Sequence, residues 1–315
     1  MFFRLIQTLD TRLLPRRKGE EIETEIESLR SHVRVILYVK LLRCQSLAMH
    51  SDIPQFCRSH GLRLNKDLGQ HFLIDKEILN TIVETADLKS EDHVLEIGAG
   101  IGILTKELIK KKGKVTTIEI DEKLIPLLKE YTTKNEKLIT NNLHIVQGNA
   151  LHVPFPKDRY KIVANIPYHI TSPLLRHAFL ESETMPDTMT LLIQREVAEK
   201  ICDTKDYGLL TILVGLFVKP KLIKIVPPES FLPPPKVESA ILHIDCFDKP
   251  VADNKTIEKV FRLTKLGFSQ KRKMLRNTVG SLDRGMEMLK EAGIDPERRP
   301  QMLSIEEWIK LATVE

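Results

Sequence analysis

The chain has 315 residues, of which 42% are hydrophobic, and its formal net charge at pH 7 is +5. This length and apolar content can bury a substantial core, and we expect two domains. The positive charge is compatible with a nucleic-acid partner but does not establish one. No apolar run approaches the roughly 20 residues that a membrane-spanning helix needs, so we expect no membrane association.

Cysteine and histidine usage gives no indication of a metal or a disulfide framework. The four cysteines are scattered, with no C-x-x-C pair, and the ten histidines include no H-E-x-x-H pair. We therefore expect no bound metal, and unpaired cysteines favour a reducing compartment. The cysteines are Cys44, Cys57, Cys202 and Cys246.

Residues 1–60 are interpreted as an N-terminal extension that is partly helical. Basic side chains dominate its first eighteen positions, as in an organellar transit segment, but acids crowd into residues 20–27, which transit peptides avoid. We favour a cytoplasmic location and leave an organellar one open. Met49 is an alternative start of the protein.

From Gly61 onward, strand and helix patterns alternate. Helical spacing over Leu104–Lys112, over Leu124–Glu130 and from Ser172 separates the strands. The alternation predicts an α/β domain over residues 61–248 with a doubly wound, largely parallel sheet. The predicted strands are Val94–Ile97, Lys114–Ile120, Leu143–Val146, Lys161–Ala164 and Thr188–Ile193.

Two further strand-like runs, Leu216–Ile225 and Val237–Ile244, flank a proline-rich stretch. They predict a hairpin-like addition at one edge of the sheet. After about Pro250 the strand signals stop and helical periodicity returns. Residues 249–315 are therefore expected to form a small α-helical domain.

The run Ile162–Tyr168, which reads I-V-A-N-I-P-Y, is a buried strand that breaks at Asn165. An amide, exposed carbonyls before Pro167 and the flat ring of Tyr168 suit a planar ring that carries an amino group. Ligands in open α/β sheets bind at such strand ends. The alternative is a proline turn with Tyr168 packed in the core.

Gly98, Gly100 and Gly102 form a G-x-G-x-G turn between a strand and a helix, where glycine lets the backbone approach a ligand. Position 103 is Ile, whereas the dinucleotide fingerprint has a third glycine further on. Glu119 ends the next strand and can accept from both hydroxyls of an unphosphorylated ribose, as in NAD or S-adenosylmethionine. For a sulfonium cofactor, Glu96 and Glu119 also supply negative potential.

Asn149 follows the third strand and could form a hydrogen bond with an adenine amino group. The alternative is a structural role, since Asn is common in turns.

Residues 259–276 carry seven basic side chains and no acid. Phosphate contact is the functional interpretation, and a solvated helix face is the alternative. The residues expected to contact RNA are Lys265, Lys271, Arg272, Lys273 and Arg276.

From residue 61 to the C-terminus the chain resembles the small-subunit ribosomal RNA adenine N6,N6-dimethyltransferases. The segments that carry this resemblance, in the family's order, are Leu68–Leu73, Glu96–Gly102, Asn165–Tyr168, Phe231–Ala240, Phe268–Asn277 and Gly293–Arg299.

The resemblance implies a Rossmann-like class I S-adenosylmethionine methyltransferase domain followed by a helical, RNA-contacting domain. The family usually carries Asp at the position of Asn149. Since Asn can still accept through its carbonyl oxygen, we expect retained but weakened cofactor binding. The cofactor site is implied to contain Gln70, His71, Leu73, Gly98, Gly100, Glu119, Asn149 and Asn165.

In the expected mechanism, the oxygen of Asn165 and the carbonyl of Ile166 accept the N6 hydrogens of a flipped-out adenine. Tyr168 stacks on one face of that base, Phe231 stacks on the other, and positioning supplies most of the catalysis. No side chain stands out as a general base.

The expected reaction is dimethylation of two adjacent adenines near the 3′ end of small-subunit ribosomal RNA, by a monomer that acts on pre-ribosomal subunits. The alternatives are a methyltransferase for one adenine of large-subunit RNA and a small-subunit assembly factor in which catalysis is secondary or lost. An NAD dehydrogenase is also open, but it would leave residues 165–168 unused.

Overall fold

The computed structural model describes residues 52–62, 69–111, 113–133, 142–203, 205–270 and 272–314. All of these belong to one compact unit, His50–Glu315. Most of the predicted N-terminal extension, and Met49 with it, lies outside the described residues. The boundaries predicted at residues 60 and 248 stay predictions.

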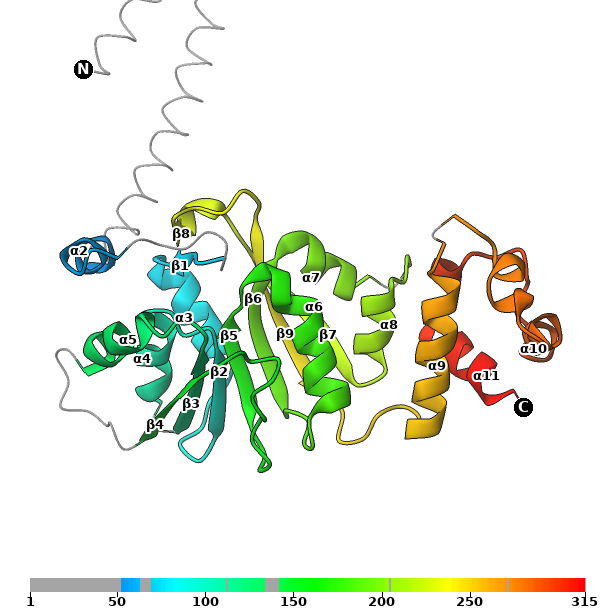
Figure 1. Cartoon of the computed structure of the whole chain (residues 1–315), viewed down its shortest axis with the longest axis horizontal. Coiled ribbons are helices and arrows are strands. Elements are labelled where there is room, and N and C mark those ends of the chain that lie inside the picture. Colours follow the sequence, from blue (N-terminus) through cyan, green and yellow to red (C-terminus); the bar gives the residue numbers. More distant parts are fainter. Residues whose placement is uncertain are drawn as a thin grey trace, which may run out of the picture. The chain divides into compact units, whose positions relative to one another are not determined.

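The core of the fold is a seven-stranded sheet with the strand order β4-β3-β2-β5-β6-β9-β7 (Figure 1). The first five strands in this order run parallel, and β9 and β7 are antiparallel additions at one side. The strands are β2 (His93–Ile97), β3 (Lys114–Glu119), β4 (Leu143–Gln147), β5 (Lys161–Asn165), β6 (Thr188–Gln194), β7 (Val218–Val226) and β9 (Ser239–Cys246).

All five predicted parallel strands are confirmed, and so is the hairpin-like addition. β9 pairs with both β6 and β7, so the last two strands extend the sheet. β7 begins at Val218 because Leu216 still belongs to the end of the preceding helix, where its N–H donates to the Ile212 carbonyl.

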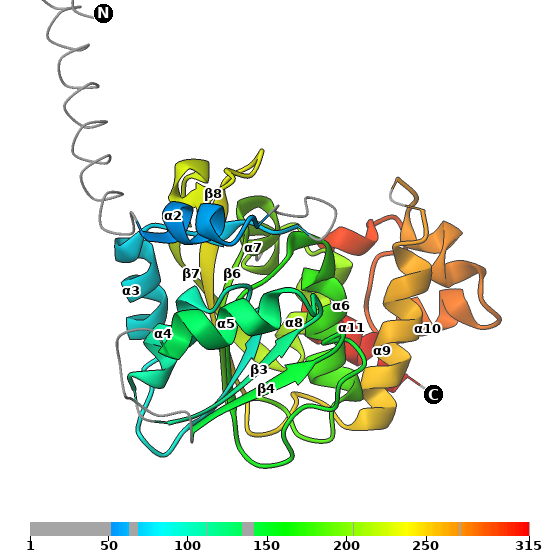
Figure 2. The same ribbon diagram turned by 60° about the vertical axis from the view of Figure 1, so that its left-hand side comes forward.

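Helices cover both faces of the sheet (Figures 1 and 2). Because side chains alternate along a strand, Ile162 and Ala164 of β5 enter one apolar cluster while Val163 enters the other. The helices α3 (Lys76–Thr85), α4 (Ile103–Ile109) and α5 (Leu124–Thr133) pack on the Val163 side. The opposite layer contains α6 (Thr171–Arg176), α7 (Arg195–Ile201) and α8 (Leu209–Gly215).

The structure contains several short elements that the sequence interpretation does not locate. Helix α2 (Asp52–Ser59) buries Ile53, Phe56 and Cys57, so part of the predicted extension packs on the α/β domain. β1 (Phe72–Leu73) pairs antiparallel with β8 (Phe231–Leu232). Short helical turns complete this half of the chain at Tyr168–Ile170, His177–Glu181 and Pro228–Ser230.

The C-terminal part is all helical, as predicted. It contains α9 (Asn254–Gly267), α10 (Gly285–Glu291) and α11 (Ile305–Thr313), with 3-10 turns at Leu275–Asn277, Val279–Ser281 and Pro300–Met302. α9 packs against α8 and α11. Trp308 of α11 is fully buried, and Ser304 and Glu307 form a capping box that starts this helix.

Among the described helices, none is long and apolar enough to cross a membrane. Over the same residues, no group of three or more His, Cys, Asp or Glu side chains could hold a metal ion.

Candidate active site

One pocket lies at the carboxyl ends of the parallel strands. There the strand order reverses, because β3 and β4 lie on one side of β2 and β5 lies on the other. This reversal of strand order is where open α/β sheets bind ligands. Every residue predicted to bind the cofactor lines this pocket, together with the turn from Asn165 to Tyr168. The structure thus brings together Gln70, His71, Leu73, Gly98, Gly100, Glu119, Asn149, Asn165, Ile166, Pro167 and Tyr168.

The glycine loop after β2 needs glycine for both conformation and space. Gly98, Gly100 and Gly102 have φ values of 74°, 59° and 90°. A Cβ atom on Gly98 would lie 3.3 Å from Pro167 Cδ, and one on Gly100 would lie 2.8 Å from Phe72 Cε1. The loop is therefore held between the turn after β5 and the segment that carries β1.

Gly100→Ala is expected to lower the free energy of unfolding by about 2–3 kcal/mol, because strain in the left-handed region adds to displacement of the Phe72 ring. Urea unfolding measures this loss. Gly61→Ala is the matched control, since Gly61 has the same φ of 59° but no atom within 4 Å of an added Cβ. Equal losses in the two variants would contradict the contact with Phe72.

Glu119 is 5% exposed and is held by two backbone N–H groups. Gly100 donates to its Oε2 at 2.7 Å, and Asp121 donates to its Oε1 at 2.9 Å. Burial raises the pKa of Glu119 above its usual value, although these N–H groups act in the opposite direction. Each carboxylate oxygen keeps a lone pair for a ligand hydroxyl.

Glu96 lies deeper, beneath the glycine loop. It is 1% exposed and accepts a 2.6 Å hydrogen bond from Thr105 Oγ1. Burial raises the pKa of Glu96 to about 7. At neutral pH its charge is therefore only partial, so Glu119 is the stronger source of negative potential for a cationic ligand.

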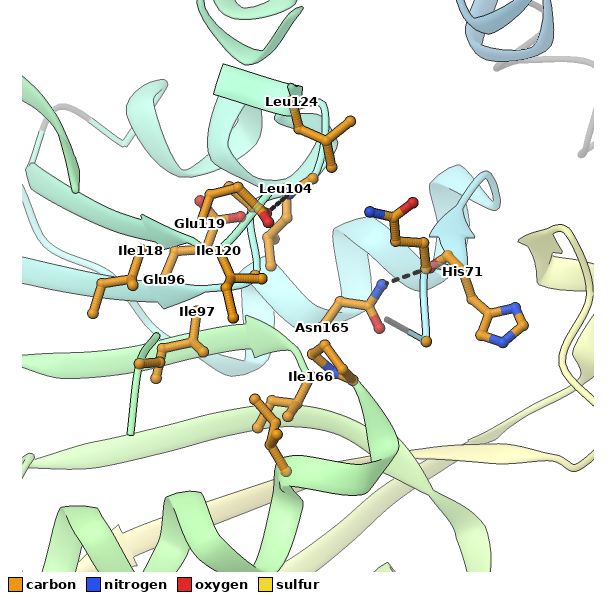
Figure 3. A pocket seen from close by; sticks show the side chains of 18 of the residues that line it. His71, Glu96, Ile97, Leu104, Ile118, Glu119, Ile120, Leu124, Asn165 and Ile166 are labelled. Atoms are coloured by element: carbon orange, nitrogen blue, oxygen red, sulfur yellow. Dashed lines mark hydrogen bonds between the residues drawn. The ribbon is translucent and has the colours of Figure 1, made fainter. Parts of the chain in front are cut away.

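The carboxamide of Asn165 is oriented by the backbone (Figure 3). Its Nδ2 donates to the carbonyl of His71 at 3.1 Å, and a carbonyl can only accept. The side-chain oxygen of Asn165 therefore remains an acceptor at the pocket. Ile166 is 1% exposed, and Pro167 fills the space beside Gly98 and Gly69.

Tyr168 is held at both its hydroxyl and its ring. Its Oη lies 2.6 Å from Ser239 Oγ, and Ser239 is fully buried at the start of β9. Its ring is nearly parallel to the imidazole of His71, with centroids 6.1 Å apart. The His71 Nδ1 in turn lies 2.7 Å from the Pro233 carbonyl. Burial raises the pKa of the Tyr168 phenol, which is therefore protonated at neutral pH.

Ser239 has no role in the sequence interpretation, although it lies in the P-P-P-K-V-E-S-A run. The sequence run marks Ser239 but does not show its partner, because only the fold brings the first residue of β9 against the turn after β5. Asp121 is a second such case, since its Oδ2 accepts a 3.0 Å hydrogen bond from Nε2 of the pocket residue Gln70.

Ser239→Ala is expected to lower turnover about 3- to 10-fold, the worth of one hydrogen bond that orients the Tyr168 ring. Cofactor affinity should change little. Tyr168→Phe removes the same bond from its other end, so the double variant should be no worse than Tyr168→Phe alone. Steady-state kinetics test this, and additive losses would contradict a role through Tyr168.

Phe231 is the one predicted catalytic residue outside the pocket lining. It is 2% exposed and lies in the apolar cluster with Phe72, because β8 pairs with β1 and directs the ring into the core. The His71 ring, not the Phe231 ring, lies parallel to Tyr168. Stacking of Phe231 on a target base stays a prediction that requires this ring to move.

The predicted RNA-contacting residues lie at and after the end of α9. Lys265, Arg272, Lys273 and Arg276 are all exposed, and Arg276 forms a surface ion pair with Glu297 at 2.8 Å. Lys271 lies outside the described residues.

Comparisons with known proteins agree with this site. A family model described as ribosomal RNA adenine dimethylase matches residues 61–314. "Ribosomal RNA small subunit methyltransferase A" of Dehalococcoides mccartyi is 38% identical over 281 residues, which cover 87% of this chain and 96% of the relative. The enzyme of the same name from Clostridium botulinum is 38% identical and covers 83% and 97%.

Solved structures give the same result. A dimethyladenosine transferase from Plasmodium falciparum superposes with a TM-score of 0.64 at 30% identity, covering 75% of this chain and 94% of that one. The 23S rRNA methyltransferase ErmE gives 0.60 at 28% identity, with 76% and 98% covered. Fold and site together define a class I S-adenosylmethionine-dependent methyltransferase. More narrowly, the chain belongs to the ribosomal RNA adenine dimethylase family.

Proposed function

We propose that this protein transfers methyl groups from S-adenosylmethionine to N6 of two adjacent adenines near the 3′ end of small-subunit ribosomal RNA, giving N6,N6-dimethyladenosine. The observation that carries the proposal is the Asn165 carboxamide, whose donor is committed to the His71 carbonyl and whose acceptor is left for the pocket. The small-subunit RNA as substrate is supported by the names of the curated relatives.

The pocket fits S-adenosylmethionine in its charge and in its layout. Glu119 offers acceptors to ribose hydroxyls, and the left-handed glycines leave room for close approach to the backbone. The cofactor supplies a methyl group on a sulfonium, which is already a strong electrophile. The chain therefore has to bind, orient and exclude water rather than activate the donor.

The acceptor side prepares a poor nucleophile. The lone pair of an adenine N6 is delocalised into the ring, and acceptors at both N6 hydrogens draw the nitrogen toward tetrahedral geometry. For the first transfer, Asn165 Oδ1 and the Ile166 carbonyl fill these two roles, with Tyr168 against the base. The monomethylated N6 keeps one hydrogen, so the second transfer uses only one of these acceptors. Stacking of the target base on this ring contributes about 1–3 kcal/mol, which offsets part of the cost of unstacking the base from the RNA.

No general base is assigned. The carboxylates that line the pocket are both engaged, Glu96 with Thr105 and Glu119 with backbone N–H groups. The N6 proton therefore leaves to solvent after the methyl has transferred.

The decisive experiment is transfer of labelled methyl groups to undermethylated small and large ribosomal subunits, assayed separately and followed by nucleoside analysis. Label in N6,N6-dimethyladenosine supports the proposal. Label only in large-subunit RNA would point to the other substrate, and tight subunit binding without label would point to an assembly factor. We further propose that the protein works as a cytoplasmic monomer on pre-ribosomal subunits.

Arg272 and Lys273 are proposed to contact RNA phosphates. Replacing both with alanine should weaken RNA binding and reduce the slope of log affinity against log salt by about 0.7–0.9 for each phosphate that is no longer neutralised. Arg276→Ala is the control, since this side chain already pairs with Glu297 and should contribute less. A salt slope unchanged by the double replacement would remove these residues from the RNA interface.

A further inference from the structure

Asn149 occupies a rigid turn at the carboxyl end of β4 and lines the pocket. Its side-chain Oδ1 accepts from the backbone N–H of Leu151 at 3.0 Å, and its own carbonyl accepts from His152 at 2.8 Å and Val153 at 3.0 Å. The side chain is therefore fixed by a local hydrogen bond before any ligand binds.

That bond fixes which terminal atom of the carboxamide lies beside Leu151. A backbone N–H can only donate, so the atom beside Leu151 must be the oxygen of Asn149. The other terminal atom is Nδ2, which is a donor without acceptor capacity. The sequence-based expectation was the reverse, a carbonyl oxygen that accepts from an adenine amino group.

The strand order indicates which part of the cofactor meets this donor. Along the carboxyl edge of the sheet, Asn149 follows β4, Glu119 ends β3, the glycine loop follows β2 and Asn165 ends β5. If the methyl group lies by Asn165 and the ribose by Glu119, the heterocycle lies at the β4 end. This step rests on the proposed function.

We propose that Asn149 donates a hydrogen bond to the N1–C6 edge of the cofactor's base and does not select for the 6-amino group. Adenine offers N1 as an acceptor beside that amino group, and hypoxanthine, whose N1 carries a proton, offers its 6-carbonyl oxygen at the same edge. A donor at position 149 accommodates both bases. A carboxylate there would accept from the 6-amino group of adenine, whereas with hypoxanthine it could accept only from N1–H and would be repelled by the neighbouring 6-carbonyl oxygen.

The test is calorimetric binding of S-adenosylhomocysteine and S-inosylhomocysteine to the full chain and to Asn149→Asp. Aspartate keeps an acceptor for the Leu151 N–H, so the turn is preserved while the outward donor becomes an acceptor. The wild type should bind the two ligands within about threefold of each other, and Asn149→Asp should favour the adenosyl ligand by at least about tenfold.

Asn149→Ser is a second variant, because its hydroxyl can keep the turn but does not extend to the base. It should weaken both ligands alike and leave their ratio near that of the wild type. If the wild type prefers the adenosyl ligand by tenfold or more and Asn149→Asp keeps the same preference, the inference about Asn149 is overturned and the proposed function is unaffected. If neither ligand binds the folded protein, the cofactor assignment falls with it.

Discussion

Asn165→Ala is expected to lower methyl transfer by about 100- to 1,000-fold, the range for losing one preorganised hydrogen bond to a group that gains charge in the transition state. The side chain is fixed through Nδ2 to the His71 carbonyl, so its oxygen needs no reorganisation when an N6 hydrogen arrives. The labelled-methyl assay on undermethylated small subunits measures the loss.

Asn165 also fastens the segment that carries His71, and Asn165→Asp separates the two roles. Aspartate keeps an acceptor but cannot donate to the His71 carbonyl, so it should loosen that segment and weaken S-adenosylhomocysteine binding as well as transfer. Asn165→Ala with undiminished transfer would remove Asn165 from the catalytic machinery. A loss confined to cofactor binding in both variants would assign it to the cofactor alone.

The sheet and the pocket could be predicted because their signals are local. Val94–Ile97 and Lys161–Ala164 are short apolar runs whose type follows from composition and flanking turns. Parallel strands bring their carboxyl ends to one edge, so Glu119 and Asn165 had to approach each other once the strands were assigned.

Elements that depend on distant partners could not be predicted. β1 and β8 have two residues each, and neither run reads as a strand without the other. This pairing decides that Phe231 points into the core. Helix α8 reads L-L-T-I-L-V-G, an apolar and β-branched run whose composition does not separate a helix from a strand.

The orientation of polar side chains was also beyond the sequence. Asn149 and Asn165 are the same residue type at equivalent strand ends, yet the backbone fixes the oxygen of one and the nitrogen of the other. Which atom remains for a ligand is decided by Leu151 and His71, and only the folded chain specifies those partners.

Glu96 should make the protein less stable as the pH rises from about 5 to about 8. Burial raises the pKa of Glu96 from 4.5 to about 7 in the folded state. Between these values the folded chain holds a proton that the unfolded chain has released, so raising the pH favours unfolding. The stabilisation is fully present at pH values below the pKa of Glu96 in the unfolded chain, and it is lost as the pH rises through the pKa in the folded chain. The free energy of unfolding falls by about 3 kcal/mol between these limits.

Urea unfolding of the wild type and Glu96→Gln across this pH range measures the effect. Glutamine is uncharged, resembles the protonated acid in shape and keeps an acceptor for Thr105 Oγ1. At pH 5 the two proteins should differ by less than about 1 kcal/mol, and at pH 8 Glu96→Gln should be the more stable. The raised pKa of Glu119 acts in the same direction and is present in both proteins, so most of its contribution cancels in their difference. Parallel stability curves would show that Glu96 ionises alike in the folded and unfolded chain, and its burial beneath the glycine loop would then carry no penalty for charge.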